Sequence, residues 1–109
     1  MSDWGWDVLR NTIEWSGGFA PQHRQLVSYI TFAKKNAMIG KMVIIQGIKV
    51  SASEDGSSFL GTLDFDFHWA YNSTDENENE VVEIGGMLTN FSTTTTYNYL
   101  KFELNVIYI

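Results

Sequence analysis

The feature of this sequence that most constrains its fold is a run of bulky side chains at every second position. Between residues 63 and 71, smaller or polar residues alternate with Leu63, Phe65, Phe67, Trp69 and Tyr71. Successive side chains of a β-strand point to opposite faces of a sheet, so a period of two predicts a strand with one buried face. We therefore expect the side chains of Leu63, Phe65, Phe67 and Trp69 to be buried.

The last segment of the chain alternates in the same way. Its bulky apolar positions are Leu100, Phe102, Leu104, Val106 and Tyr108. This pattern predicts a second strand with a buried face, and we expect Phe102, Leu104 and Val106 to lie in the core. Residues 43–50 are rich in β-branched side chains and are followed by a polar turn over residues 51–58, which predicts a further strand.

Two segments fit either a strand or a helix. Residues 25–33 are rich in residue types that favour strands, although a helix over residues 22–36 would also keep its apolar side chains on one face. Residues 4–13 form the other segment whose periodicity allows a helix. The strand is the favoured interpretation of residues 25–33, and the helix stays open as the alternative.

Glycine and threonine shape the region before the last strand. Gly85 and Gly86 predict a turn or a bulge between two short strands within residues 81–92. The four β-branched threonines at residues 93–96 predict extended chain. About six short strands separated by turn residues favour an all-β, antiparallel sandwich or barrel.

The composition indicates a single domain with a sizeable core. Of the 109 residues, 44% are hydrophobic and 15% aromatic, and each aromatic side chain can bury a large area. The absence of cysteine excludes a disulfide framework, thiolate metal ligands and a thiol nucleophile. Thirteen acidic and seven basic residues give a formal charge of -6, the wrong sign for neutralising phosphates. We therefore expect no nucleic-acid partner and no binding to anionic membranes.

The sequence also bears on localisation. No apolar run approaches the ~20 residues needed to cross a bilayer, so we expect no membrane insertion. Residues 1–10 are polar and acidic where a signal peptide would carry a basic start and an apolar run. With no signal peptide expected and no cysteine present, the sequence predicts a cytoplasmic or non-classically exported protein.

Three residues that could carry chemistry share one parity of the strand predicted at residues 63–71. Asp64, Asp66 and His68 lie about 7 Å apart by strand rise, and histidine with carboxylates can bind a metal or transfer protons. A solvated strand face has the same composition, and no second histidine or carboxylate pair elsewhere completes a metal shell. The sequence pairs no nucleophile with a base. We therefore expect a non-enzyme without metal or cofactor, in which these three residues serve folding or subunit contact.

Short motifs along the chain occur in a recognisable order. They are Asn11-Thr12-Ile13-Glu14-Trp15, Ile30-Thr31-Phe32-Ala33, the apolar strand at residues 43–50, Gly86-Met87 and Asn105-Val106-Ile107. Over residues 11–107 this order resembles the H-type lectin domain, the family of the snail agglutinins and of the C-terminal domain of the slime-mould discoidins. The resemblance implies a trimer of six-stranded antiparallel β-sandwiches, formed by residues 11–109 after an N-terminal extension at residues 1–10. It also places Trp15 and Phe91, as an aromatic pair, where secreted members have a disulfide.

The resemblance implies a multivalent carbohydrate-binding module for galactose and N-acetylgalactosamine type glycans, whose partners are glycans and further copies of the chain. The candidate contact residues carry cationic, hydroxyl or aromatic groups in loops: Arg24, Thr94, Thr95, Tyr97 and Tyr99. Arg24 matches a basic loop position of the family, and Thr94 and Thr95 stand where sugar-binding members have a Trp-His pair. The alternative interpretation of the threonine and tyrosine residues is an ordinary surface.

The trimer is expected to use faces opposite the core that are more apolar than a free surface needs. Those faces carry Leu60, Thr62, Tyr97, Tyr99, Ile107 and Ile109. The rival function is a structural or receptor-binding trimeric module, such as the tip domain of a phage tail or fibre, which would use the same sandwich for assembly.

Overall fold

The computed structural model describes residues 5–35 and 38–108, and these form two antiparallel sheets. The strands are β1 (Gly5–Phe19), β2 (Arg24–Ala33), β3 (Val43–Ser53), β4 (Gly61–Thr62), β5 (Asp64–Thr74), β6 (Glu80–Thr89) and β7 (Tyr97–Tyr108). The expected all-β sandwich is confirmed. The expected count of six strands is wrong, because the two-residue strand β4 pairs with the end of β3 and makes seven. Among the described residues, no helix is long and apolar enough to cross a membrane.

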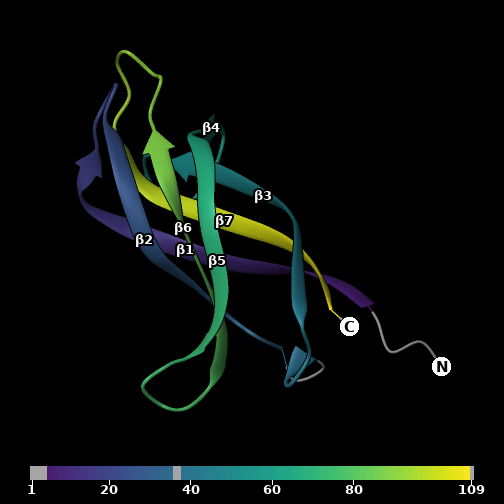
Figure 1. Cartoon of the computed structure of the whole chain (residues 1–109). Helices are drawn as coiled ribbons and strands as arrows, with labels where there is room; N and C mark the ends of the chain where they lie inside the picture. The colour runs from purple at the N-terminus through teal and green to yellow at the C-terminus, as the bar shows by residue number, and fades with distance from the viewer. Residues whose placement is uncertain (1–4, 36–37, 109) are drawn as a thin grey trace.

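The two sheets pack face to face around one core. One has the strand order β1-β7-β3-β4 and the other the order β2-β6-β5. Figure 1 shows the strands of the three-stranded sheet crossing in front of β1 and β7. The core between the sheets is formed by fully buried side chains from both sheets, including Ile30, Phe32, Ile84, Leu88, Leu100, Phe102 and Leu104.

Strand β7 confirms the alternation of the last segment. It lies between β1 and β3, so every backbone group along it can pair with a neighbour. Phe102, Leu104 and Val106 are buried as expected, whereas Lys101 and Glu103 are on the opposite face. A strand with neighbours on both sides and one face on the core is the environment for which a period of two is diagnostic.

Strand β1 covers the described part of residues 4–13, the segment whose periodicity also allowed a helix. Residues 5–14 pair with β7 without a register shift, from Gly5 opposite Tyr108 to Glu14 opposite Tyr99. The boundary expected at residue 10 therefore falls inside a strand, and residues 5–10 are part of the sheet; residues 1–4 lie outside the described part of the chain. Leu9 is buried in the core, which explains why this segment pairs as a strand.

Strand β5 departs from the expected pattern. It lies at the edge of its sheet, and its pairing with β6 shifts between Phe67 and Trp69, so that His68 is an extra residue. Leu63 is buried and Phe65 packs partly against the core, but Trp69 is only partly buried. The expectation that Phe67 is buried is wrong, because its side chain is 44% exposed at the open edge between β5 and β3.

Strand β6 runs unbroken through Gly85 and Gly86, so these glycines form no turn between two short strands. A Cβ atom on Gly85 would collide with the indole of Trp69, and one on Gly86 would collide with the backbone of Asp66. Instead, each of the two strands beside β6, β2 and β5, contains a bulge at this level. On β2 two residues, Ser28 and Tyr29, stand opposite the single Gly85, which also excludes the helix alternative for the described part of residues 22–36.

The segment at residues 93–96 bends before β7 and is not the extended chain that was expected. The hydroxyl of Ser92 accepts hydrogen bonds from the backbone amides of Thr94 and Thr95, at 3.2 and 2.9 Å, and this local bonding replaces strand pairing. The aromatic pair implied by the resemblance is also absent. Phe91 is 71% exposed, and Trp15 packs edge-on against Phe19 with ring centroids 5.1 Å apart.

Candidate functional site

The two loops that carry the expected contact residues, the turn before β2 and the loop before β7, are in contact at one end of the sandwich. The turn before β2 and the loop before β7 are joined by two backbone hydrogen bonds, from Gln22 to Ser92 at 3.1 Å and from Asn90 to His23 at 2.9 Å. The buried amide of Asn90 also donates to three backbone carbonyls, those of Phe19, Ala20 and Thr95. This network fixes the end of the sandwich beside which a cleft opens.

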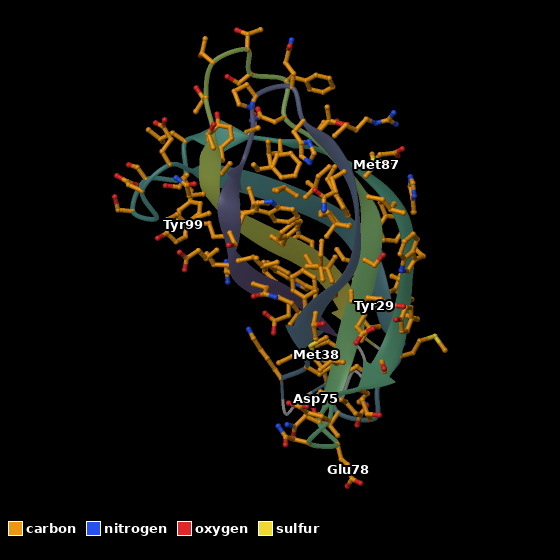
Figure 2. The ribbon with its side chains drawn as sticks, turned by 90° about the vertical axis from the view of Figure 1, so that its left-hand side faces the viewer. Tyr29, Met38, Asp75, Glu78, Met87 and Tyr99 are labelled. Atoms are coloured by element: carbon orange, nitrogen blue, oxygen red, sulfur yellow. The ribbon has the colours of Figure 1, made fainter. Side chains whose placement is uncertain are left out.

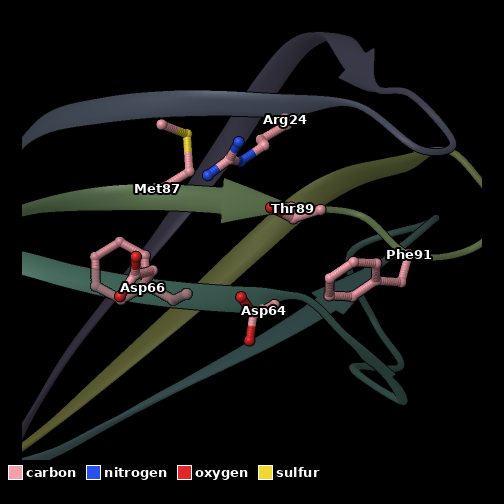
Figure 3. A pocket seen from close by; sticks show the side chains of 7 residues that line it. Arg24, Asp64, Asp66, Met87, Thr89 and Phe91 are labelled. Carbon is pink, nitrogen blue, oxygen red and sulfur yellow. The ribbon is translucent and has the colours of Figure 1, made fainter.

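The cleft lies on the outer face of the three-stranded sheet. Arg24 on β2 and Asp64 on β5 are both paired with Thr89 on β6, so the three residues form one row across the sheet. Met87 and Asp66 form part of the next row. The cleft has a volume of about 490 Å³ and is lined by Arg24, Asp64, Phe65, Asp66, Met87, Thr89 and Phe91. We call it the Arg24 cleft (Figure 3).

The groups in the Arg24 cleft are chemically complementary. A guanidinium offers five N–H donors, carboxylates are acceptors only, and a threonine hydroxyl can do both. Figure 3 shows the guanidinium of Arg24 beside Met87, with Asp64 and Asp66 on the other side of β6. The exposed ring of Phe91 adds an apolar surface at the end of the cleft. A small polar molecule with one apolar face would satisfy all of these groups.

The structure separates the five expected contact residues. Arg24 lines the cleft, whereas Thr95 and Tyr97 line a second pocket on the other side of the loop, together with Ser53 and Asp55. Thr94 is exposed in the loop at residues 93–96. The ring of Tyr99 lies beside Gly56, at 3.2 Å from the position a Cβ atom there would take. The expected site is therefore not a single surface within one chain.

The second pocket is bordered by a turn whose polar groups are already engaged. The hydroxyl of the buried Ser53 accepts hydrogen bonds from the amides of Asp55 and Gly56 and donates to the Asp55 carboxylate. That carboxylate also accepts hydrogen bonds from the amides of Ser57 and Ser58. The bond from Ser57, followed by that from Ser53, lowers the pKa of Asp55 to about 2. Asp55 therefore stabilises the turn through hydrogen bonds that all reach its Oδ1 atom.

Sequence reasoning did not connect Asp64 and Asp66 with Arg24. The carboxylates lie 40 or more positions along the chain from the arginine, and only the strand order β2-β6-β5 brings them together. His68 follows the expected grouping, since its Nε2 atom lies 3.4 Å from the Asp66 carboxylate. Within residues 5–35 and 38–108, no three histidine or acidic side chains are arranged so that they could hold a metal ion.

Comparison with protein-family models, with curated proteins and with solved structures gives no match for this chain.

Proposed function

We propose that the chain is a carbohydrate-binding module and that the Arg24 cleft is its glycan site. The observation that carries the proposal is one open cleft in which Arg24, Asp64 and Asp66 lie beside the exposed ring of Phe91. A sugar ring has hydroxyl groups that donate and accept hydrogen bonds, and it has an apolar C–H face. Small-molecule sites commonly combine apolar or aromatic walls with a few convergent polar groups, as this cleft does.

Charge favours a neutral sugar over an anionic one. The cleft holds one guanidinium and two carboxylates, and the chain has a formal charge of -6. A phosphate or carboxylate group on the ligand would be repelled by Asp64 and Asp66, whereas hydroxyl groups can donate hydrogen bonds to them. The resemblance of the sequence to H-type lectin domains points to the same class, glycans of the galactose and N-acetylgalactosamine type.

A trimer would multiply the weak affinity of a single open cleft, because linked sites raise the effective concentration of the ligand. The outer face of the four-stranded sheet offers one apolar row for self-association, next to rows that carry charged residues. Trp6, Ile107 and Ile44 form one row across β1, β7 and β3, and Trp6 is 72% exposed. Of the residues expected at this contact, Leu60 and Thr62 are exposed, Tyr97, Tyr99 and Ile107 are partly buried, and Ile109 lies outside the described residues.

A glycan array followed by calorimetry on the sugars that bind tests the proposal. We expect Arg24→Ala and Asp64→Asn to lower the affinity at least tenfold while the melting temperature changes little, because both side chains are exposed. Arg10→Ala is the matched control, since Arg10 is an exposed arginine on the other sheet, paired with Glu103 at 3.1 Å. It should bind as the unmodified chain does.

Two results would contradict the proposal. Binding that survives both cleft variants would remove the cleft as the glycan site, and loss of binding in Tyr97→Ala alone would assign the sugar to the second pocket. If no glycan binds and the chain is still an oligomer, the rival function as a structural or receptor-binding module is supported instead.

A further inference from the structure

We infer that the glycan site extends beyond the Arg24 cleft onto an aromatic surface formed by Tyr29, Trp69 and Tyr71, so that the ligand is an oligosaccharide spanning both. This inference rests on the glycan-binding function proposed above. We call the three residues the aromatic platform. It lies on the same outer face as the cleft, farther along β6 toward the β5–β6 turn.

The platform exists because both flanking strands bulge at one level of the sheet. Ile84 and Leu88 on β6 are in the core, so Met87 and Gly85 face outward. On β5 the extra residue His68 precedes Trp69, which is paired with Gly85. An extra residue in a strand reverses the faces of all residues after it. Trp69 therefore faces outward, although it has the same parity in the sequence as the inward-facing Phe65.

Gly85 provides the space in which the indole lies. A Cβ atom at this position would collide with the Cζ2 and Cε2 atoms of Trp69, so the ring lies directly against the backbone of β6. Any larger residue at position 85 would lift the indole off the sheet. Trp69 is partly buried, and this contact holds its ring against the outer face of β6.

Two tyrosines flank the indole on either side of β6. Tyr29 is 68% exposed and stands in the β2 bulge with a φ of 62°. Left-handed backbone is unfavourable for an aromatic residue, and such strain concentrates at functional positions. Tyr71 is paired with Glu83, and a hydrogen bond to that carboxylate, with burial a smaller cause, raises the pKa of Tyr71 to about 12.

The cleft and the platform form one continuous surface. Met87 and Asp66 line the platform-side end of the cleft, and Gly85 lies two residues from Met87 along β6, about 7 Å by strand rise. Asp66 also pairs with His68, whose ring centroid is 6.0 Å from that of Trp69. Figure 2 shows Met87 and Tyr29 along the same side of the molecule. A ligand longer than the cleft would therefore meet the aromatic rings next.

The chemistry of the platform favours a sugar over a protein segment or an anionic chain. An aromatic face suits the C–H face of a pyranose ring, and the groups around it are hydrogen-bonding ones, from Glu83, Tyr71, His68 and Asp66. These include two carboxylates, which would repel phosphate or sulfate groups. A surface that binds a protein would instead be expected to have an apolar centre from which charged groups are depleted.

The test compares two probes, galactose and linear galactotetraose, by calorimetry on the full chain. The unmodified chain should bind the tetraose at least tenfold more tightly than galactose. Trp69→Ala and Tyr29→Gly should lower tetraose affinity about tenfold, to a level near that of galactose, and leave galactose affinity within twofold of the unmodified value. Tyr29→Gly also relieves the left-handed backbone, so it keeps the test valid if Trp69→Ala does not fold.

Arg24→Ala and Arg10→Ala are the comparison variants. The first should lose both probes, and the second, which removes an exposed side chain on the four-stranded sheet, should lose neither. Equal affinity for the two probes, or tetraose binding unchanged in Tyr29→Gly, would overturn the extended site while leaving the cleft in place. A failure of the unmodified chain to bind either probe or any arrayed glycan would remove the proposed function as well. A change in oligomer mass in Tyr29→Gly with unchanged glycan affinity would overturn the inference in favour of a protein contact.

Discussion

The two sheets of the sandwich carry different kinds of outer face. Along the central strand β7, every second residue from Leu100 to Val106 is in the core, and pairing with β1 holds one register over residues 5–14. In the three-stranded sheet, both strands beside β6 contain an extra residue next to Gly85. The outward apolar row of the first sheet is Trp6, Ile107 and Ile44, whereas the second sheet turns Trp69 and Tyr71 out. The interruption beside Gly85 is what places these two aromatic side chains on the outer face of the second sheet.

Bulges also mark the open edge of the molecule. The pairing of β3 with β7 shifts its register between Ile45 and Gly47, and the pairing of the edge strand β5 with β6 shifts between Phe67 and Trp69. Edge strands expose unpaired backbone groups, and bulges are one means by which proteins discourage further strand pairing there. The interruption on β5 therefore serves two ends, since it distorts the edge and it places the indole outside.

The largest expected effect is a difference in the free energy of unfolding between variants of the two alternating segments. Phe102→Ala should lower the free energy of unfolding by about 3–5 kcal/mol, because Phe102 is fully buried and packs edge-on against Phe65 at 6.0 Å. Phe67→Ala should cost about 1 kcal/mol, because nearly half of that side chain is already in water. Urea denaturation of both variants measures the difference. Equal losses would mean that the two strands bury their aromatic residues alike.

The second effect concerns the glycines of the two sheets. Gly85→Ala should destabilise the fold by about 1–3 kcal/mol, because its methyl group displaces the indole of Trp69. Gly47→Ala is the matched control in the four-stranded sheet, where the nearest atom is 4.0 Å from the new Cβ. It should be close to neutral. Thermal unfolding, followed by circular dichroism, measures the stability of both variants. An unchanged stability of Gly85→Ala would mean that the indole of Trp69 does not lie against Gly85.

The two outer faces should also respond differently in assembly. Ile44→Lys places a charge in the apolar row of the four-stranded sheet and should shift the proposed trimer towards monomer in sedimentation at micromolar concentration. Tyr29→Gly, on the other sheet, should leave the mass unchanged. A monomeric unmodified chain, or dissociation caused only by Tyr29→Gly, would contradict this division of roles.

The smallest effects are those of pH, and they have opposite signs in the two sheets. The pKa of Tyr71 is raised from 10.0 to about 12 by Glu83, so the stability it contributes is present below pH 10 and is lost as the pH rises through 12. The pKa of Asp55 is lowered from 3.8 to about 2, so its contribution is present above pH 3.8 and is lost as the pH falls through 2. Nuclear magnetic resonance titration should find both values, and Glu83→Gln should return only Tyr71 towards 10.

Much of the fold is encoded in local alternation. The burial of Phe102, Leu104 and Val106 follows from their spacing, because a strand in the middle of a sheet has no freedom to change faces. The bulge at His68 could not be inferred, since a polar residue between Phe67 and Trp69 continues the alternating pattern that it interrupts in space. Gly85 was the one local signal of this bulge in the sequence. The group that requires a glycine there, the indole of Trp69, lies on the neighbouring strand β5.

The candidate site was less accessible to sequence reasoning than the fold. The resemblance pointed to the turn before β2 and the loop before β7 as the source of the contacts, and Arg24 lies beside the point where these loops meet. That Asp64 and Asp66 share a cleft with Arg24 was not predicted, because the two carboxylates have the pattern of a solvated strand face and only the strand order places them across β6 from the arginine. Residues that meet only through the pairing of distant strands leave no pattern in a single sequence.

The most direct test of this account is the position of the Trp69 ring, measured by nuclear Overhauser effects in the isotope-labelled chain. The bulge at His68 predicts strong effects between the indole protons of Trp69 and the α protons of Gly85, with those α protons shifted upfield by the ring. Strong effects from the same indole to the core side chains of Phe102 or Leu104 would show that β5 alternates without interruption. The outward aromatic platform would then not exist.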